Sequence, residues 1–187
     1  EELTYQGAGL YVAGGTANIS YTIFGHNLLS QGIYISGGTA TIDQSVIADN
    51  GGQGLYRNDG SMAVSNTIIW GNNNNDSGDI SYSYCDRQGS PPDGEGNITQ
   101  DPLFMDSGSG DYHLTWANYP VQDATMSPCI DAGDPDPQYN DPDDSRNDMG
   151  AYYFHQPGTG PQANFSANPA SGSVPLSVEF TDLSTPI

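Results

Sequence analysis

Seven aspartates fall within one stretch of the chain, DAGDPDPQYNDPDDSRNDMG, and are its strongest candidates for chemistry. Ca²⁺ takes about six to eight oxygen ligands from carboxylates, amides and carbonyls on a flexible loop. Carboxylates packed this densely repel one another unless a cation neutralises them. This Asp-rich segment (residues 131–148) therefore predicts a calcium site, with candidate ligands Asp131, Asp134, Asp136, Asp141, Asp143, Asp144 and Asp148. The spacing matches neither an EF-hand nor a glycine-rich nonapeptide, so the alternative is that these residues cap turns and Arg146 holds the loop to a carboxylate.

Arg57 is a second candidate for chemistry, because it is the only basic residue in the repeated part of the chain. It lies in RNDG beside Asp59 and could act as a base next to a carboxylate, or it could simply pair with Asp59 or a neighbour in a loop. Glycoside hydrolysis needs two carboxylates at a defined separation. The repeats offer Asp43, Asp49 and Asp59, and no two of them occupy equivalent positions. We therefore predict no catalytic residue and favour a protein that is not an enzyme.

Three tyrosines recur at one position of the repeat: Tyr11, Tyr34 and Tyr56. Each stands next to an apolar position, so we expect the rings to project outward as a stack. Such a stack is a candidate platform for sugar rings, and the alternative is that it stabilises the sheet through cross-strand pairs.

Two cysteines and four N-x-S/T sequons bear on where the protein resides. In an extracellular chain we expect Cys85 and Cys129 to form a disulfide, which contributes about 4 kcal/mol on the chain-entropy model. The alternative is two buried free thiols. The sequons predict a secreted glycoprotein, with candidate acceptors Asn18, Asn75, Asn97 and Asn164.

The elements that must position these groups come from a repeat. The stretches GLYVAGGTANISYTIFGHN, GIYISGGTATIDQSVIADN and GLYRNDGSMAVSNTIIWGN begin at Gly9, Gly32 and Gly54, at offsets of 23 and 22 residues. Their A-x-I alternation is typical of strands, and a unit this short becomes stable only by stacking on its neighbours. Equivalent residues then lie above one another at about 4.8 Å. The columns that predict this stacking are Leu10, Ile33 and Leu55; Ile19, Ile42 and Val64; and Asn27, Asn50 and Asn72.

We therefore predict an all-β chain whose main domain is a right-handed parallel β-helix. A leucine-rich repeat has a similar period, but its L-x-x-L-x-L-x-x-N pattern and helical return are absent. The later motifs DISYSYC, GEGNITQDPLF, GDYHL, SPCIDAGDP and RNDMGAY follow in this order. Together with the repeats they resemble secreted right-handed β-helix proteins of the pectate-lyase-like superfamily, over residues 7–153.

The resemblance implies a β-helix domain at residues 1–154 that ends in the Asp-rich segment as a closing loop. The link before Ser-Pro-Cys is longer than usual, which predicts a loop at residues 116–126. Relatives include polysaccharide lyases, which pair calcium with an Arg or Lys base, and glycoside hydrolases, which use carboxylates. The chain has no lysine, which removes half of the lyase options.

The tail is a different module. After a linker at residues 155–162, the stretch ANFSANPASGSVPLSVEFTDLST resembles the opening two strands of a PKD-type immunoglobulin-like domain, at residues 163–187. Two strands of a sandwich are not stable alone, so we expect them to dock on, or be donated to, a neighbouring subunit. Each open end of a solenoid also exposes unpaired strand edges. Head-to-tail assembly with other copies of the chain would cover both ends.

The net charge of the chain limits the kinds of partner that it can bind. The formal net charge is −20 and there is no lysine, which excludes nucleic acid as a partner and disfavours anionic membranes. No apolar run is long enough to span a bilayer. The expected function is a non-catalytic extracellular structural or cell-surface protein, adhesin-like or a head-to-tail filament subunit. The alternatives are a polysaccharide-degrading lyase or glycoside hydrolase, and a carbohydrate-binding module.

Overall fold

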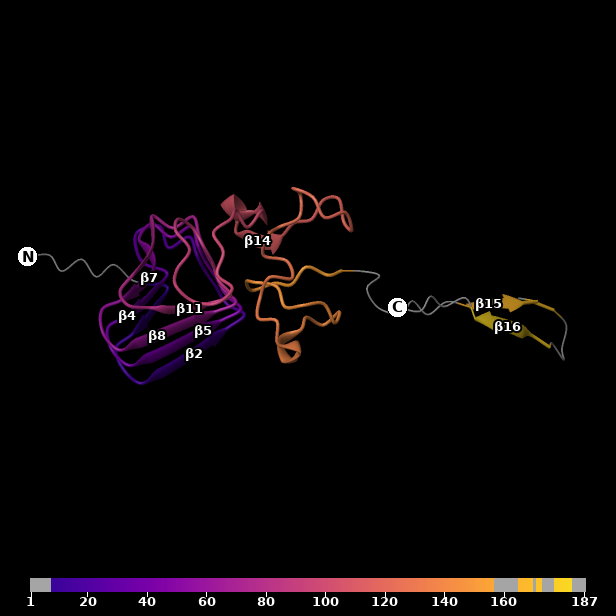
Figure 1. The fold of residues 1–187 in the computed structure, drawn as a ribbon, viewed down its shortest axis with the longest axis horizontal. Helices are drawn as coiled ribbons and strands as arrows, with labels where there is room; N and C mark the ends of the chain where they lie inside the picture. Colours follow the sequence, from indigo (N-terminus) through magenta and orange to yellow (C-terminus); the bar gives the residue numbers. More distant parts are fainter. Residues whose placement is uncertain (1–7, 157–164, 170, 173–176, 183–187) are drawn as a thin grey trace, which may run out of the picture.

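The computed structural model describes residues 8–156, 165–169, 171–172 and 177–182, without the side chains of Asn75 and Asp182 (Figure 1). The described residues contain strands, turns and two short 3₁₀ helices, η1 (Ser107–Ser109) and η2 (Pro137–Tyr139), and no α-helix. In this part of the chain no helix has the length and apolar character needed to cross a bilayer.

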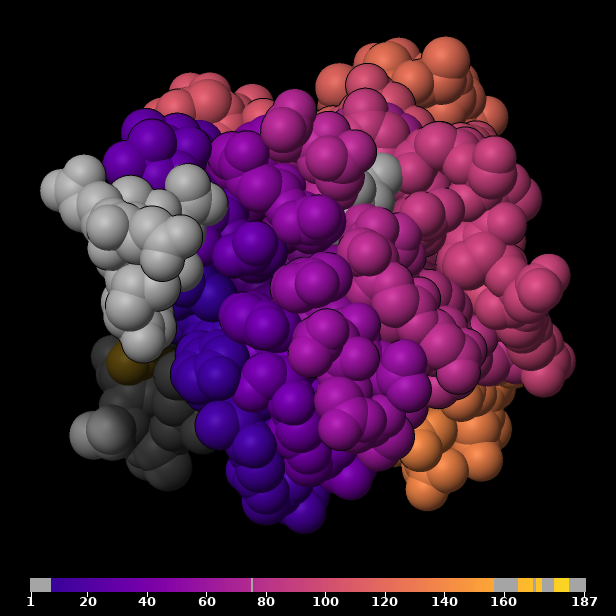
Figure 2. Space-filling model, turned by 90° about the vertical axis from the view of Figure 1, so that its left-hand side faces the viewer, coloured from indigo at the N-terminus to yellow at the C-terminus, as the bar shows by residue number. Residues whose placement is uncertain are grey.

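Twelve short strands wind into a parallel β-solenoid of about four turns, which confirms the predicted stacking of the repeats. Each turn gives one strand to each of three sheets, ordered β1-β4-β7-β10, β2-β5-β8-β11 and β3-β6-β9-β12, and every neighbouring pair is parallel. The strands are β1 (Leu10–Val12), β2 (Thr16–Ser20), β3 (Ile23–Gly25), β4 (Ile33–Ile35), β5 (Thr39–Asp43), β6 (Val46–Ala48), β7 (Gln53–Arg57), β8 (Ser61–Ser65), β9 (Ile68–Trp70), β10 (Asn74–Ser77), β11 (Ser81–Ser83) and β12 (Asp86–Arg87). Figure 2 shows the coils side by side, from indigo to pink.

The register places like residues directly above one another. Ile42 pairs with Ile19 on one side and Val64 on the other, as the columns predicted. Asn27, Asn50 and Asn72 form a side-chain ladder: each Nδ2 of the first two donates to the Oδ1 of the next at 2.7 Å. A buried amide ladder of this kind satisfies polar groups that the apolar core cannot.

The glycine columns of the repeat form tight turns. Gly38 and Gly60 have φ of +87° and +82°, a region that favours glycine. A Cβ added at Gly60 would lie 2.2 Å from the Gly38 carbonyl oxygen of the coil below. Glycine is needed here because successive coils approach too closely for a side chain.

The third sheet (β3-β6-β9-β12) is buried on both faces. Ile47 and Ile69 face the solenoid interior, whereas Val46 and Ile68 face outward into a second apolar cluster with Met149. Successive residues of a strand point to opposite faces, so this sheet needs a covering layer on its outer side. Figure 1 shows that layer as the orange segment beside the solenoid.

The covering layer contains β13 (Phe104–Asp106), antiparallel to β14 (Asp111–Leu114), followed by turns. A bridge between Trp116 and Met126 closes the predicted loop at residues 116–126. The indole Nε1 of Trp116 donates to the Val121 carbonyl inside this loop at 2.8 Å. The loop is therefore an ordered element and belongs to the second cluster.

Near the C-terminus, β15 (Phe165–Asn168) and β16 (Glu179–Asp182) form an antiparallel pair, as predicted. The rings of Phe165 and Phe180 lie 5.8 Å apart, and each side chain is 67% exposed. The predicted linker falls mostly outside the described residues, because 157–164 are not among them.

The fourth turn closes the core with polar groups at inward positions. Asp76 pairs with Leu55, Tyr82 with Val64 and Arg87 with Ile69, so each polar residue continues an apolar column. The Arg87 guanidinium forms an ion pair with the Asp76 carboxylate, and the Tyr82 hydroxyl donates to the same carboxylate. We call Asp76, Tyr82 and Arg87 the terminal cluster.

Candidate functional site

The Asp-rich segment lies along the outer face of the third sheet, at the side of the solenoid. The Gln44 Nε2 atom donates to Asn147 Oδ1 at 2.6 Å. Asn66 accepts two backbone N–H bonds, from Asp134 to its Oδ1 at 2.7 Å and from Gly150 to its carbonyl at 2.8 Å. Residues 68 to 103 positions later in the sequence thus fasten to turns of the second and third coils.

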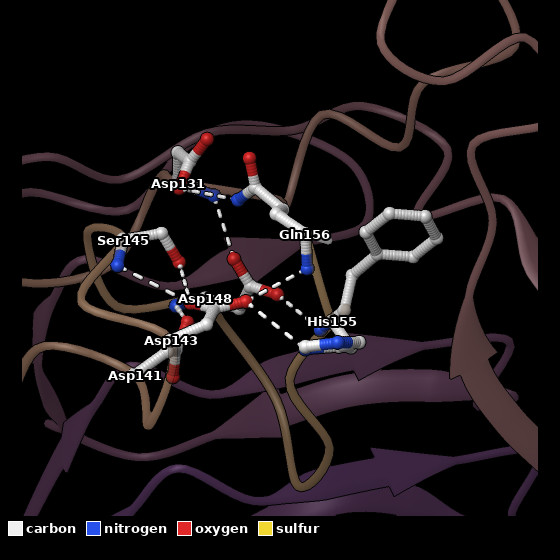
Figure 3. A network of polar contacts seen from close by, with 8 residues as sticks. Asp131, Asp141, Asp143, Ser145, Asp148, His155 and Gln156 are labelled. Carbon is white, nitrogen blue, oxygen red and sulfur yellow. Dashed lines mark hydrogen bonds and ion pairs between the residues drawn. The ribbon is translucent and has the colours of Figure 1, made fainter. Parts of the chain in front are cut away.

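Four of the seven aspartates gather in one polar network (Figure 3). Asp148 is central: its Oδ1 accepts the Asp131 N–H at 2.7 Å, and its Oδ2 accepts the Phe154 N–H at 2.6 Å. The Asp148 N–H in turn donates to Asp141 Oδ2 at 3.0 Å. These carboxyl groups join three separate stretches of backbone.

Asp143 ties the end of the segment to the chain that follows. Its Oδ1 accepts the Ser145 hydroxyl at 2.6 Å, and its Oδ2 accepts the Gln156 N–H at 2.7 Å. The His155 Nδ1 lies 3.5 Å from the same Oδ2, and Gln156 Nε2 donates to Asp131 Oδ1 at 2.9 Å. Asp131 and Asp143 therefore fix residues 155–156 against the segment.

Burial changes the protonation of the two innermost acids. Burial, with a smaller contribution from the neighbouring Asp141 and Asp131 carboxyls, outweighs the backbone hydrogen bonds and raises the pKa of Asp148 to about 8. Burial likewise raises the pKa of Asp141 to about 6, with added repulsion from Asp143 and Asp131. At neutral pH, Asp148 is thus mostly an uncharged carboxylic acid.

The other three predicted calcium ligands lie elsewhere. Asp134 and Asp136 cap short turns, since the Asp134 Oδ1 accepts the Asp136 N–H at 2.9 Å and the Asp136 Oδ1 accepts the Gln138 N–H at 3.1 Å. Asp144 is exposed at a φ of +67°. Across the residues that the structure describes, no group of three or more His, Cys, Asp or Glu side chains is arranged to hold a metal ion. Calcium binding stays a prediction.

Arg146 holds the loop, but not through a carboxylate as the alternative to a calcium site had expected. Its Nε donates to the Gly133 carbonyl at 2.9 Å, so a backbone oxygen takes the place of the expected carboxylate. Arg57 behaves alike: its Nε donates to the Gly60 carbonyl at 2.9 Å. Asp59 accepts the Gly60 N–H at 2.7 Å. Arg57 and Asp59 therefore share a glycine in a turn, and neither forms an ion pair in the described part of the chain.

A cavity of about 440 Å³ is lined by residues of both the solenoid and the Asp-rich segment. Its lining combines rings, amides and carboxyl groups from both sides: Tyr21, Gln44, His113, Tyr139, Asn140, Asp141, Pro142, Asp148, Gly150, Ala151, Tyr152 and Tyr153. The His113 imidazole stacks on the Tyr152 ring, with centroids 4.0 Å apart and planes 9° apart. We call this space the tyrosine-lined cavity.

The predicted tyrosine stack is present on the first sheet. The ring centroids of Tyr11 and Tyr34 lie 5.1 Å apart, and those of Tyr34 and Tyr56 lie 4.9 Å apart. The Ser36 hydroxyl donates to the Tyr11 hydroxyl at 2.8 Å, and Tyr11 is 56% exposed. Sugar binding by this stack stays a prediction.

The predicted disulfide is wrong: Cys85 and Cys129 are both free and buried. Cys85 belongs to the core inside the solenoid, while Cys129 belongs to the cluster on the other face of the third sheet. The sheet between them keeps the thiols apart. Burial raises the pKa of both thiols, to about 12 for Cys85, which leaves them uncharged and unreactive.

The sequence reasoning missed Asp86, which is fully buried at an outward position above Ile68. Its Oδ2 accepts the Cys129 thiol at 3.2 Å, its Oδ1 accepts the Gln100 N–H at 3.2 Å, and burial raises its pKa to about 6. The signal was present, because Asp86 interrupts the column of Ile23, Val46 and Ile68.

The four sequons differ in their surroundings. Asn18 is exposed and its Oδ1 accepts the Thr41 hydroxyl at 2.7 Å. Asn97 is partly buried: its Oδ1 accepts the Cys85 N–H at 2.9 Å, and its Nδ2 donates to the Asp93 carbonyl at 3.2 Å. Glycosylation at Asn97 would compete with these bonds. Asn164 and the side chain of Asn75 lie outside the described residues.

Comparison with family models, with curated proteins and with solved structures finds no match for this chain. The functional argument therefore depends on the fold and on the contacts described above.

Proposed function

We propose that this chain is a non-catalytic extracellular structural protein, an adhesin-like module of a cell surface. The observation that carries the proposal is the use of the carboxyl groups in the Asp-rich segment. Asp131, Asp141, Asp143 and Asp148 each accept hydrogen bonds that join the covering layer to itself. Side chains committed in this way to backbone and side-chain donors of the same chain favour a rigid, self-contained rod over a reaction centre.

The proposal includes membership of the pectate-lyase-like β-helix superfamily and a PKD-type identity for the C-terminal strands. The parallel solenoid and the antiparallel pair β15–β16 are what those assignments require. The exposed Phe165 and Phe180 rings give the pair an apolar face, which suits docking on another surface.

Within this proposal an adhesin-like module is favoured over a head-to-tail filament subunit. The terminal cluster places the Arg87–Asp76 ion pair at the end of the fourth turn. The side chains of Arg87 and Asp76 are 22% and 12% exposed, and a partner stacked there would have to remove this remaining surface of the ion pair from water, which is unfavourable. The ion pair therefore disfavours the predicted self-association at this end of the solenoid.

The carbohydrate-binding alternative rests on the tyrosine stack of Tyr11, Tyr34 and Tyr56. Its test is Tyr34→Ala: loss of glycan retention at an unchanged melting temperature would favour it. The enzyme alternative has weaker support, because Arg57 is held in a turn by Gly60.

The proposal is tested by incubating the protein with uronate-containing and neutral polysaccharides, with and without calcium. We expect no release of unsaturated or reducing ends above a heat-denatured control. Sustained release that disappears on denaturation would show an enzyme. Light scattering on the same sample addresses assembly, and we expect a monomer.

A further inference from the structure

The tyrosine-lined cavity has an aromatic wall that the proposed surface role does not use. Tyr21 is 66% exposed, and Tyr139, Tyr152 and Tyr153 are 39%, 40% and 42% exposed. These rings come from the first coil, from η2 and from the stretch after the Asp-rich segment. A hollow that brings exposed rings together from three parts of the chain is the usual form of a small-ligand site.

The cavity also has an acidic lining without a cation. Asp141 and Asp148 are 7% and 2% exposed. In the described part of the chain, the ion pairs are Arg87–Asp76, His113–Asp111 and His155–Asp143. No cationic side chain therefore pairs with either acid. A second copy of the chain would not supply an ammonium group from a lysine, because the sequence contains none.

Charge decides which ligands suit this lining. With a net charge of −20, the protein repels uronates, sulfates and phosphates and attracts cations. Tyrosine faces bind ammonium groups through the cation–π interaction, and nearby carboxylates strengthen the attraction. Calcium suits the lining less, because it prefers six to eight free oxygens, roughly, and both Asp148 oxygens already accept backbone N–H bonds.

We propose that the tyrosine-lined cavity binds an organic ammonium group, stacked on the tyrosine rings and held by the carboxylate of Asp141. The group is either a free amine or the lysine side chain of a partner protein. This site does not depend on the proposed surface role, since an enzyme or a filament subunit with the same cavity would have it too.

Protonation of the acids that face the cavity works against such a ligand. Asp131 and Asp143 add negative charge near Asp141, and the His113 ring borders the cavity. Acidification neutralises Asp141, which weakens cation binding. The affinity should therefore rise with pH.

The experiment titrates the whole protein with tetramethylammonium chloride at constant ionic strength. Binding is measured by calorimetry and by changes in the amide shifts of NMR spectra. Neopentyl alcohol serves as the neutral probe of similar shape, and Nα-acetyl-lysine amide represents a partner's lysine. We expect saturable millimolar binding of at least one cation and none of the alcohol. The tighter cation identifies the source of the ammonium group.

Two variants locate the binding. Tyr152→Ala should weaken it about two- to fivefold, and Asp141→Asn about tenfold or more. Tyr11→Ala is the matched control, because Tyr11 is 56% exposed on the first sheet and does not line the cavity. It should change nothing. Tyr152 is exposed, so its variant is expected to fold even if Asp141→Asn does not.

Lowering the pH from about 8 to about 5 should weaken binding roughly tenfold, as Asp141 takes up its proton. Three results would overturn the proposal. The alcohol could bind as tightly as the cations, or Tyr11→Ala and Tyr152→Ala could weaken binding equally. Alternatively, calcium or a neutral disaccharide could saturate the site in place of the ammonium probes. None of these results bears on the polysaccharide release assay, so the two proposals fail separately.

Discussion

The asparagine ladder offers the sharpest test of how the coils are held together. Asn50 is 2% exposed and stands in the middle of the ladder. Its Oδ1 accepts from both the N–H and the Nδ2 of Asn27, and its Nδ2 donates to the Phe24 carbonyl and to Asn72 Oδ1. Asn50→Ala removes all four bonds and leaves the Asn27 N–H and the Phe24 carbonyl without these partners.

Each buried polar group left unpaired costs about 1–3 kcal/mol, so Asn50→Ala should lower the free energy of unfolding by about 3–5 kcal/mol. Asn27→Ala is the matched control at the end of the ladder. It removes the hydrogen bond from its Nδ2 to Asn50 Oδ1 and should cost about 1 kcal/mol.

Equilibrium unfolding in urea, followed by circular dichroism, measures both variants on the same scale. A loss for Asn50→Ala no greater than that for Asn27→Ala would refute the reasoning, because the middle of the ladder would then contribute no more than the single bond at its end. A reduced unfolding cooperativity in Asn50→Ala would show that the coils unfold separately and would be read from the slope of the transition.

Three further predictions follow from the same contacts. Cys85 and Cys129 should be inert to a thiol reagent in the native protein and both react after unfolding, and a reductant should leave the melting temperature unchanged. Arg87→Met should lower the free energy of unfolding by about 3 kcal/mol, because it leaves the largely buried Asp76 carboxylate without its cation; Asp76→Asn in the same background should restore part of the loss. Because the folded pKa of Asp148 is raised to about 8 from 3.8, the folded state holds its proton more tightly, so the stability that this group contributes is complete below about pH 4 and is lost as the pH rises to about 8. Urea unfolding at a series of pH values measures this loss.

Much of the solenoid was predictable because its repeat lies in the residues themselves. The columns of Ile19, Ile42 and Val64 and of the three ladder asparagines specify the register, since a shift by one residue would move every apolar side chain to the wrong face. The glycine columns specify the turns. The tyrosine stack followed from the same alignment.

The covering layer was less predictable, although one signal pointed to it. Val46-Ile47 and Ile68-Ile69 are adjacent apolar pairs, and adjacent positions point to opposite faces, so the third sheet had to be buried on both sides. Which segment covers it depends on contacts between residues far apart in the sequence, such as Gln44 with Asn147. Periodicity within a repeat carries no information about such contacts.

The cysteine prediction failed for a related reason. Cellular compartment suggests whether thiols are oxidised, but only the fold says whether they meet. Cys85 points into the solenoid, so its neighbour Asp86 points outward and meets Cys129 instead. The terminal cluster was missed because the fourth turn lacks the glycine motif of the first three, and its alignment with them was not evident.

The central claim concerns the carboxyl groups of the Asp-rich segment, which hold the covering layer together through hydrogen bonds. Their pKa values can be measured directly by a carbon-detected NMR titration of labelled aspartate, with and without calcium. The account predicts a pKa of about 8 for Asp148 and about 6 for Asp141, unchanged by calcium. Ordinary values near 4, roughly as in model peptides, or a large downward shift on adding calcium, would contradict it.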